Sequence, residues 1–307
     1  MLDVVVVNWN AGAQLRACLE SIAKCGSDVV KRTVVVDNGS SDGSDAIVED
    51  FPNVTLVRAN ENLGFGKASN LGAAHGDSEF LLFLNPDAAL YPGTLRKSLE
   101  FMRESTNTKV GICGVQLLDK SRHVARSCAR FPSALGFVAY ASGLDRIYPR
   151  LGHFMVEWDH GQTRQVDHVI GAFFLVRRQV FDALSGFDER FFLYLEDLDF
   201  SLRARKQGWS SIYLTSTQAF HAGGGTSNQI KDRRLFYSLR SRLLYAFKHF
   251  TAYGATAVLA TTLLIEPLSR SGLALVQGSI PRLRETWMAY GMLWRWLPQW
   301  VLQGQTR

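Results

Sequence analysis

Cysteine is scarce in this chain and is not arranged for a structural role. The four cysteines among the 307 residues are Cys18, Cys25, Cys113 and Cys128. They show neither the close pairs of a zinc site nor the density of a disulfide scaffold, so we expect packing residues in a reducing compartment. The segment Met1-Leu2-Asp3 leads directly into an apolar run, without the basic and apolar regions of a secretory signal. A cytoplasmic location is therefore expected.

The sequence also lacks the glycine-rich signatures of two large nucleotide-binding classes. Neither a GxGxxG fingerprint nor the GK[ST] of a P-loop is present. This absence argues against a nicotinamide-dependent dehydrogenase. What is present is Asn62-Leu63-Gly64-Phe65-Gly66-Lys67-Ala68-Ser69-Asn70, a glycine-bearing entry to a helix. It could hold a diphosphate at the helix N-terminus, or it could be only a tight strand-to-helix turn.

Four short apolar runs in the first ninety residues each stop on polar side chains. The runs Val4–Val7, Val34–Val36, Val54–Val57 and Phe80–Leu84 end on Asn8, Asp37, Arg58 with Asn60, and Asn85-Pro86-Asp87. Such runs, separated by helical stretches, are typical of strands buried on both faces of a parallel sheet. Ligands of these sheets bind outside the carboxyl ends of the strands. The polar residues are thus expected to meet in one crevice.

The remaining elements follow the same alternating pattern up to about residue 230. We expect helices near Ala13–Lys24, Ser44–Asp50, Gly66–His75, Thr94–Glu104 and Glu196–Gln207. We expect further strands at Val110–Leu118, Val166–Arg177 and Ser211–Leu214. Between them, Pro132–Gln165 has an irregular pattern, which favours a loop region facing a ligand. The fold class is α/β, with a mostly parallel central sheet flanked by helices.

Two acids at strand ends are candidates for binding a nucleotide. Asp37 could accept the imide N–H of a pyrimidine base, although turn and cap chemistry would also explain its neighbours Asp42 and Ser44. Asp87 follows a deeply apolar strand, where a carboxylate is costly to bury unless it meets a cation or several donors. A divalent metal bridging diphosphate oxygens would satisfy it, and a helix N-cap is the competing interpretation.

A second acidic cluster opens the helix expected at Glu196. Helix-dipole stabilisation and an i,i+4 pair between Asp199 and Arg203 account for part of the cluster Glu196-Asp197-Leu198-Asp199. The remaining acid suggests a general base. His221 lies in Phe220-His221-Ala222-Gly223-Gly224-Gly225, where we expect a flexible loop and a side chain able to complete a metal site.

The last quarter of the chain differs from the rest in its charge and in the spacing of its apolar residues. From Lys231 onward there are 11 Lys or Arg against 3 Asp or Glu, whereas the residues before it hold 23 against 25. Apolar residues from Leu235 to Phe250 recur at helical spacing with arginines, including Arg240 and Arg242, on the remaining surface. The apolar stretch Gly254–Ile265 is closed by Glu266-Pro267 and is too short to span a bilayer.

Tryptophans and arginines mix further along this last quarter. Trp287, Trp294, Trp296 and Trp300 alternate with basic residues in a pattern suited to a membrane interface. A helical cap or a dimer interface is the alternative interpretation. No nucleic-acid-binding motif accompanies the charge, and the oligomeric state is left open.

The ordered set of motifs resembles family 2 glycosyltransferases of the GT-A fold, most closely their bacterial rhamnosyltransferase-like branch. The resemblance covers residues 2 to about 230 and rests on VVVVNWN, VVVDNGSSDGS, NENLGFGKASN, FLLFLNPDA, GAFFLVRR, GFDERFFLYLEDLDFSLR and FHAGGGTS. It implies a GT-A domain at residues 1–230. From its charge and periodicity, the region 231–307 is expected to be basic, amphipathic and helical, and to associate with membrane. The resemblance also implies an inverting transferase that uses a nucleotide-diphosphate sugar with Mg²⁺ or Mn²⁺.

The resemblance assigns roles to individual residues. The residues expected to bind the base and the sugar nucleotide are Asn8, Asp37, Asn62, Gly64, Lys67, Asn70 and Asn85. The metal ligands are Asp87 and His221, and the catalytic base is Asp197 with Glu196 beside it. Beyond the resemblance, we expect Asp199 and Arg203 to orient the acceptor. One departure from the family pattern is Asn85, which stands where the metal-binding triplet usually begins with aspartate.

The resemblance favours transfer of L-rhamnose from dTDP-rhamnose to a hydroxyl of a polyprenyl-diphosphate-linked or polysaccharide acceptor, in cell-envelope glycan synthesis at the inner face of the bacterial membrane. A UDP-hexose-dependent galactosyl- or glucosyltransferase of the same fold is the alternative. A non-catalytic nucleotide-sugar-binding protein would keep Asp37 and the glycine loop but would not need the acidic cluster. A sugar nucleotidyltransferase, which would consume nucleoside triphosphate, is a further alternative.

Overall fold

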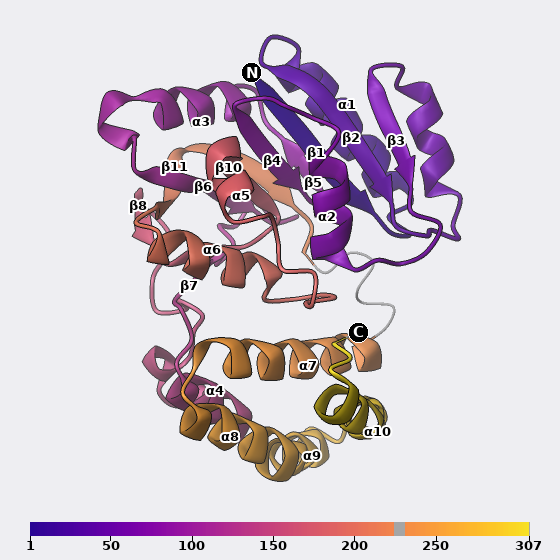
Figure 1. The fold of residues 1–307 in the computed structure, drawn as a ribbon, viewed down its shortest axis with the longest axis vertical. Helices are drawn as coiled ribbons and strands as arrows, with labels where there is room; N and C mark the ends of the chain where they lie inside the picture. The colour runs from indigo at the N-terminus through magenta and orange to yellow at the C-terminus, as the bar shows by residue number, and fades with distance from the viewer. Residues whose placement is uncertain (224–230, 307) are drawn as a thin grey trace. The chain divides into compact units, whose positions relative to one another are not determined.

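The computed structural model describes residues 1–223 and 231–306, and these residues form two compact units (Figure 1). The first, here called the sheet unit, contains residues 1–130 and 158–189 together with the described residues that follow Leu195 up to 223. The second, the helical unit, contains residues 131–157, 190–195 and the described residues from 231 on. The sequence places one division near residue 230, whereas in the structure two earlier segments also fold with the C-terminal helices.

The sheet unit is built on a nine-stranded mixed sheet with the strand order β3-β2-β1-β4-β10-β6-β11-β5, and β8 pairs with β11. Strands β3, β2, β1 and β4 are parallel, and β10 runs antiparallel between β4 and β6. The bounds are β1 Leu2–Asn8, β2 Val30–Asp37, β3 Val54–Arg58, β4 Phe80–Leu84, β5 Ala88–Leu90, β6 Val110–Leu118, β8 Arg164–Val166, β10 Phe173–Arg177 and β11 Ser210–His221. The predicted α/β class and mostly parallel sheet are confirmed.

Helices and short turns connect these strands. The bounds are α1 Ala13–Gly26, η1 Ser44–Asp50, α2 Phe65–Ala73, α3 Thr94–Arg103, η2 Ser105–Asn107, α5 Arg178–Ala183 and α6 Glu196–Lys206. The five predicted helices are present, although η1 is a 3₁₀ helix, whereas α5 and η2 were not predicted. A separate two-stranded sheet pairs β7, Cys128–Ala129, with β9, His168–Val169.

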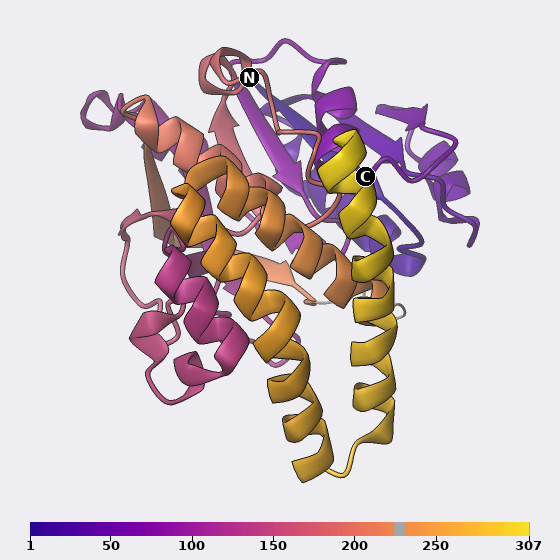
Figure 2. The same cartoon turned by 60° about the horizontal axis from the view of Figure 1, so that its bottom comes forward.

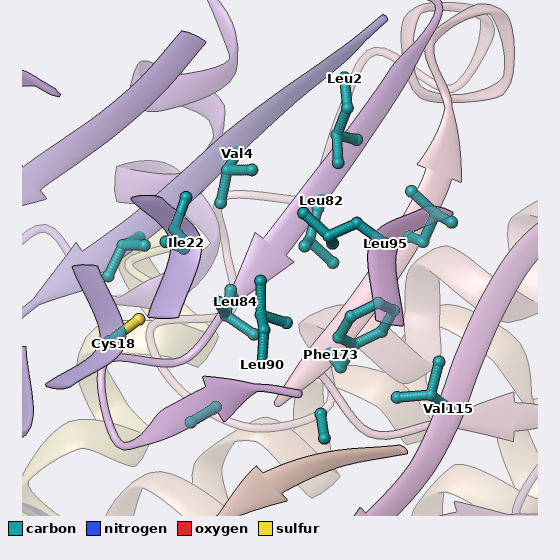
Figure 3. Close-up of a cluster of buried hydrophobic side chains, with 14 of the residues drawn as sticks. Leu2, Val4, Cys18, Ile22, Leu82, Leu84, Leu90, Leu95, Val115 and Phe173 are labelled. Carbon is teal, nitrogen blue, oxygen red and sulfur yellow. The ribbon is translucent and has the colours of Figure 1, made fainter. Parts of the chain in front are cut away.

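The central strands are buried on both faces, as their unbroken apolar sequences predict. One face forms the larger core, where Val4, Leu82 and Leu84 meet side chains of α1 and α3 such as Ile22 and Leu95 (Figure 3). On the other face, Val34, Val36 and Ala68 of α2 form a smaller cluster. The backbone of α2 comes so close that a Cβ added at Gly72 would lie 2.4 Å from Cγ1 of Val5.

Three local predictions were wrong. The strand expected over residues 166–177 is split into β8, β9 and β10, because the chain leaves the large sheet at Asp167, pairs with β7, and returns at Phe173. The strand expected at 211–214 continues to His221, which therefore ends β11 instead of lying in a loop. The segment expected to be irregular, residues 132–165, contains α4, Ala134–Ser142, and the 3₁₀ turns η3, Leu144–Arg146, and η4, Pro149–Leu151.

The helical unit combines α4 and these turns with the C-terminal helices (Figure 2). The helices are α7 Lys231–His249, α8 Ala252–Ala260, a π-helical turn η6 Thr261–Ile265, α9 Glu266–Val276 and α10 Ile280–Gln303. Helices α8 and α9 run on from one another through η6, and Pro267 follows shortly after this π-helical turn, which is a usual way for a helix to accommodate an interruption of its hydrogen-bond ladder. The resulting 25-residue helix, Ala252–Val276, is long and apolar enough to cross a membrane by length and composition alone. The predicted stop at Glu266-Pro267 is therefore wrong.

Two arginines of α7 are buried, although the helical pattern predicts that they face solvent. Arg240 and Arg242 are buried, with 4% and 3% of their surface exposed. Arg242 forms an ion pair with Glu266 at 2.5 Å, and the Arg240 guanidinium lies over the rings of Phe192 and Tyr237. Periodicity marked these positions as polar but could not reveal that each has a partner from another segment.

Candidate active site

Asn8 and Asp37 lie side by side because β1 and β2 are parallel neighbours in register at these residues. The Asn8 amide Nδ2 donates to Asp37 Oδ1 at 3.0 Å and to Ser44 Oγ at 2.8 Å. Asp37 Oδ2 also accepts the backbone N–H of Ser40 at 3.2 Å. Asn8 Oδ1 is buried and has no hydrogen-bond partner among the described residues. The two residues thus form a preorganised polar corner at the strand ends.

The loop before α2 is fastened to this corner through Asn38, which the sequence did not mark as a site residue. Asn38 Nδ2 donates to Asn62 Oδ1 at 3.0 Å, and Asn38 Oδ1 accepts the N–H of Leu63 at 2.8 Å. Gly64 then begins α2 with φ 78° and ψ 171°, a backbone conformation essentially reserved for glycine. The one signal for Asn38 in the sequence is that it directly follows Asp37.

Lys67 and Asn70 lie on α2 and differ in their surroundings. Lys67 is half-buried near the start of the helix. The Asn70 amide donates to the carbonyl of Phe187 at 2.9 Å, and its Oδ1 accepts the N–H of the same residue at 2.9 Å. Asn70 therefore anchors the segment before α6, and its role in binding nucleotide sugar stays a prediction.

Asp87 and His221 are brought together by the pairing of β5 with β11. The register sets His221 opposite Ala88, and the distance from His221 Nε2 to Asp87 Oδ1 is 3.3 Å, with 13% and 11% of the side chains exposed. Asn85 follows β4 directly, and its backbone N–H donates to the carbonyl of Ala172 at 3.1 Å. No third His, Cys, Asp or Glu joins a metal-binding group within residues 1–223 and 231–306.

Asp197 lies in the first turn of α6 with 17% of its side chain exposed. Burial alone would raise its pKa, but the nearby His168 imidazole and the N–H groups of Gly171 and Leu198 lower the pKa below the usual aspartate range. The Gly171 N–H donates to Oδ2 at 2.8 Å, and the Leu198 N–H donates to Oδ1 at 2.8 Å. This carboxylate is held in one orientation and stays ionised.

Glu196 has the opposite character. It is 4% exposed, and its Oε2 has no hydrogen-bond partner in the described part of the chain. Burial, and next the negative charge of Asp197, raise its pKa well above the usual glutamate range. Two neighbouring carboxyl groups with pKa values pushed apart are a common arrangement for acid–base chemistry.

Asp199 and Arg203 of α6 hold the turn that follows α5. Asp199 is fully buried and accepts from Arg203 Nε at 2.7 Å. The Arg203 guanidinium also donates to the carbonyls of Leu184 and Gly186, both at 2.8 Å. These bonds tie residues 184–186 to α6. The acceptor-orienting role of Asp199 and Arg203 stays a prediction.

The sheet unit brings the acidic sites to one edge of its sheet. Gly171 donates to the Asp197 carboxylate, and the carbonyl of the next residue, Ala172, accepts the N–H of Asn85. Asn8 and Asp37 end strands of the same parallel block as β4. The strand-end polar residues therefore lie at the carboxyl ends of the strands, as predicted, and the binding roles assigned to them stay predictions.

Comparison with known proteins assigns the chain to a family. The description "Glycosyl transferase family 2" matches residues 3–185, more than half of the chain. The chain belongs to this family. The family 2 assignment makes it a glycosyltransferase, and a nicotinamide-dependent dehydrogenase is ruled out.

Several relatives of this glycosyltransferase carry functional names. It is 32% identical over 236 residues to an N-acetylglucosaminyl-diphospho-decaprenol L-rhamnosyltransferase of Mycobacterium tuberculosis, covering 72% of this chain and 76% of the relative. It is 24% identical to the rhamnosyltransferase WbbL of Escherichia coli, covering 80% and 92%. The resemblance to the rhamnosyltransferase-like branch is thus confirmed.

Solved structures share its fold. TarS residues 1–349 of S. aureus in complex with UDP-GlcNAc is similar with a TM-score of 0.56, 17% identity, and coverage of 95% of this chain and 80% of that one. The mannosyltransferase PcManGT of Pyrobaculum calidifontis in complex with GDP-Man and Mn²⁺ has a TM-score of 0.55 and 18% identity, covering 99% and 84%. These likenesses support the GT-A fold.

Proposed function

We propose that this glycosyltransferase moves L-rhamnose from dTDP-rhamnose, with inversion, to a hydroxyl of a lipid-linked or polysaccharide acceptor in bacterial cell-envelope glycan synthesis. The names of the two relatives, one acting on an N-acetylglucosaminyl-diphospho-decaprenol and one called a rhamnosyltransferase, support this choice. The chain aligns with three quarters or more of each relative.

The proposed reaction is a single displacement with Asp197 as general base. Its carboxylate takes the proton of the acceptor hydroxyl while that oxygen attacks the anomeric carbon and the nucleoside diphosphate leaves. The lowered pKa keeps Asp197 ionised and able to accept. Glu196 keeps its proton because of burial, so it can donate a hydrogen bond to a sugar or acceptor oxygen.

A divalent cation, Mg²⁺ or Mn²⁺, fits the pair Asp87 and His221. Both side chains are largely buried within 3.3 Å of each other at the sheet edge. Mg²⁺ is commonly bound by one or two carboxylates together with substrate phosphates, and here Asp87 would supply the carboxylate and His221 a second protein ligand. Such an ion would neutralise charge on the departing diphosphate. Asn8 and Asp37 would receive the base, and the Asn62–Gly64 turn would approach the phosphates.

The observation that supports the mechanism is that the pKa values of the neighbouring carboxyl groups of Glu196 and Asp197 are shifted in opposite directions. Asp197→Asn should lower the rate of transfer by about 10²–10⁴-fold and leave donor binding nearly unchanged, because the amide keeps the shape of the side chain. We would measure turnover with donor and acceptor, and donor binding by thermal shift. Retained turnover in this variant would show that the base lies elsewhere.

The donor can be identified with a panel of nucleotide sugars, each with and without Mn²⁺. A bound donor raises the melting temperature in proportion to the logarithm of its concentration over Kd. We expect the largest shift with dTDP-rhamnose. A larger shift with a UDP-hexose would replace rhamnose by hexose in the proposal, and stabilisation without any donor hydrolysis or transfer would favour a binding protein.

We also place the enzyme at the cytoplasmic membrane surface, through the helical unit. Its exposed apolar side chains include Leu268, Leu275, Val276, Ile280, Trp287 and Trp294, with exposed fractions of 41% to 88%. Arg282 and Arg284 lie on the same helix as the last three. A membrane interface suits apolar and basic side chains together, and a polyprenyl-linked acceptor would be reached there.

A further inference from the structure

His168 is a buried histidine that contacts the proposed base and has no role assigned by the sequence motifs. Its Nε2 lies 3.5 Å from Asp197 Oδ2, and only 4% of its side chain is exposed. Its other ring nitrogen, Nδ1, lies 3.0 Å from Ser201 Oγ. The strand β9 presents the ring, and one turn of α6 supplies both Asp197 and Ser201.

The hydrogen bonds of Ser201 determine which ring nitrogen carries a proton. The hydroxyl donates its single proton to the carbonyl of Asp197 at 3.0 Å, so Ser201 Oγ can only accept from His168. Nδ1 of His168 is therefore an N–H donor. Nε2 faces Asp197 Oδ2, and a hydrogen bond to this ionised carboxylate requires a proton on Nε2 as well, because a carboxylate oxygen can only accept.

We propose that His168 is a positioning residue that holds the Asp197 carboxylate in its reactive orientation through a hydrogen bond from Nε2–H to Oδ2. Because Nδ1–H is donated to Ser201 and Nε2–H to Asp197, the ring is fixed at both nitrogens. Asp197 itself keeps the proton that it takes from the acceptor hydroxyl.

The surroundings contain few other charges that could take this role. Glu196 and Asp199 flank Asp197 on α6, and Asp199 is paired with Arg203. On the other side, β7 brings Cys128, whose thiol has a pKa raised by burial to about 12 and is neutral. Asp167, next to His168 in sequence, lies 3.6 Å from Arg205. Within the described residues, His168 is the imidazole that lies next to Asp197.

The inference rests on the proposed role of Asp197 as base, and two variants of His168 test it. His168→Phe removes both hydrogen bonds, and kcat should fall roughly ten- to a hundredfold, as when a group that orients a metal ligand is lost. The glutamine side chain of His168→Gln can donate an amide N–H to Oδ2, but the amide cannot gain or lose a proton. It should keep the donor KM and recover part of kcat.

The pH profile separates this role from a merely structural one. Because the imidazole lowers the pKa of Asp197, both variants should move the acid limb of kcat/KM to higher pH. An unchanged acid limb in both variants, with folded protein by circular dichroism, would overturn the inference. Recovery of the complete wild-type profile by His168→Gln would overturn it as well.

Nitrogen-15 NMR of the imidazoles gives a readout that does not depend on activity. We expect Nδ1 of His168 to carry a proton, and we expect Asp197→Asn to change the Nε2 signal. A bare Nδ1 would overturn the proposal. The matched control is His160→Gln, a fully buried histidine bonded to the Cys128 N–H and the Trp158 carbonyl. It should lower thermal stability without moving the acid limb.

The outcomes also separate this inference from the proposed function. If Asp197→Asn retains turnover, the assignment of the base fails whatever His168 does. If Asp197→Asn is inactive and the His168 variants leave the acid limb in place, only the role of His168 fails.

Discussion

At the scale of single residues, neighbouring side chains of the same type differ because of what surrounds them. Glu196 and Asp197 share a helix turn, yet Asp197 receives two backbone N–H groups and an imidazole, whereas Glu196 Oε2 has no partner among the described residues. Their pKa values therefore move in opposite directions. The chemistry of each carboxyl group follows from its local donors and not from its residue type.

The raised pKa of Glu196 has a consequence for stability. The folded protein holds this proton to higher pH than the unfolded chain, so stability falls as pH rises from the ordinary glutamate value of about 4.3 through the folded-state pKa. Glu196→Gln removes this dependence, and its stability relative to wild type should grow with pH. Urea unfolding between roughly pH 5 and 9 would measure it. Parallel curves for the two proteins would contradict the assigned protonation of Glu196.

Asp87 gives a second prediction at this scale. Asp87→Asn removes the carboxylate of the proposed metal pair, so the concentration of Mn²⁺ needed for donor stabilisation should rise by roughly ten- to a hundredfold. Thermal shift with donor across a Mn²⁺ titration would measure this change. Asp45→Asn, which loses only a surface ion pair with Arg58, should titrate like the wild type. Identical titrations for both variants would argue against a metal at Asp87.

At the scale of elements, short pairings and turns place the site. The three-residue strand β5 sets His221 beside Asp87 although the two residues are far apart in the chain. The entry to α2 depends on Gly64, whose φ of 78° and ψ of 171° other residues adopt only with strain. Gly39 is similarly constrained, since a Cβ there would lie 2.9 Å from the backbone of Glu61.

Gly64 can be tested against a glycine with a more tolerant conformation. Gly64→Ala should cost about 1–3 kcal/mol of unfolding free energy and weaken donor binding, because the turn must shift. Gly43→Asn is the control: Gly43 is left-handed with φ 74° and ψ 10°, has nothing within 4 Å of an added Cβ, and asparagine tolerates that conformation. Donor binding by Gly64→Ala equal to that of Gly43→Asn would show that the turn does not approach the donor.

At the scale of the whole molecule, the two units have different chemistry. The sheet unit carries the acidic edge, whereas the helical unit carries the basic excess and the exposed apolar side chains of α8 to α10. The interior of the helical unit is also charged, since Glu266 lies between Arg242 and Arg270. Burial would raise the pKa of Glu266, but the two arginines hold it below the usual range.

The proposed membrane contact gives a prediction for the turn between α9 and α10. Val276 and Ile280 flank this turn and are 88% and 76% exposed. The double variant Val276→Glu with Ile280→Glu should sediment with anionic phospholipid vesicles at least about tenfold less well, because each buried apolar side chain contributes roughly 1.5–3 kcal/mol. Val124→Glu, on an exposed valine of the sheet unit, is the control. Unchanged sedimentation would favour a helical cap or a dimer interface.

The order of the motifs determined the family, the fold class and most helix bounds, because apolar periodicity and strand-end polar residues are local properties of the chain. The sequence also placed Asp37, Asp87 and Asp197 at the ends or starts of elements, where parallel-sheet topology brings them to one edge.

Other features depended on pairings between distant segments, which local patterns do not encode. His168 is an isolated histidine in the sequence, and only the turn of α6 against β9 makes it a neighbour of Asp197. Arg240 and Arg242 matched a solvent-facing pattern, and only the tertiary structure supplied the aromatic rings and the carboxylate that allow them to be buried. A charged side chain can be buried only where partners surround it, and the fold determines which partners lie beside Arg240 and Arg242.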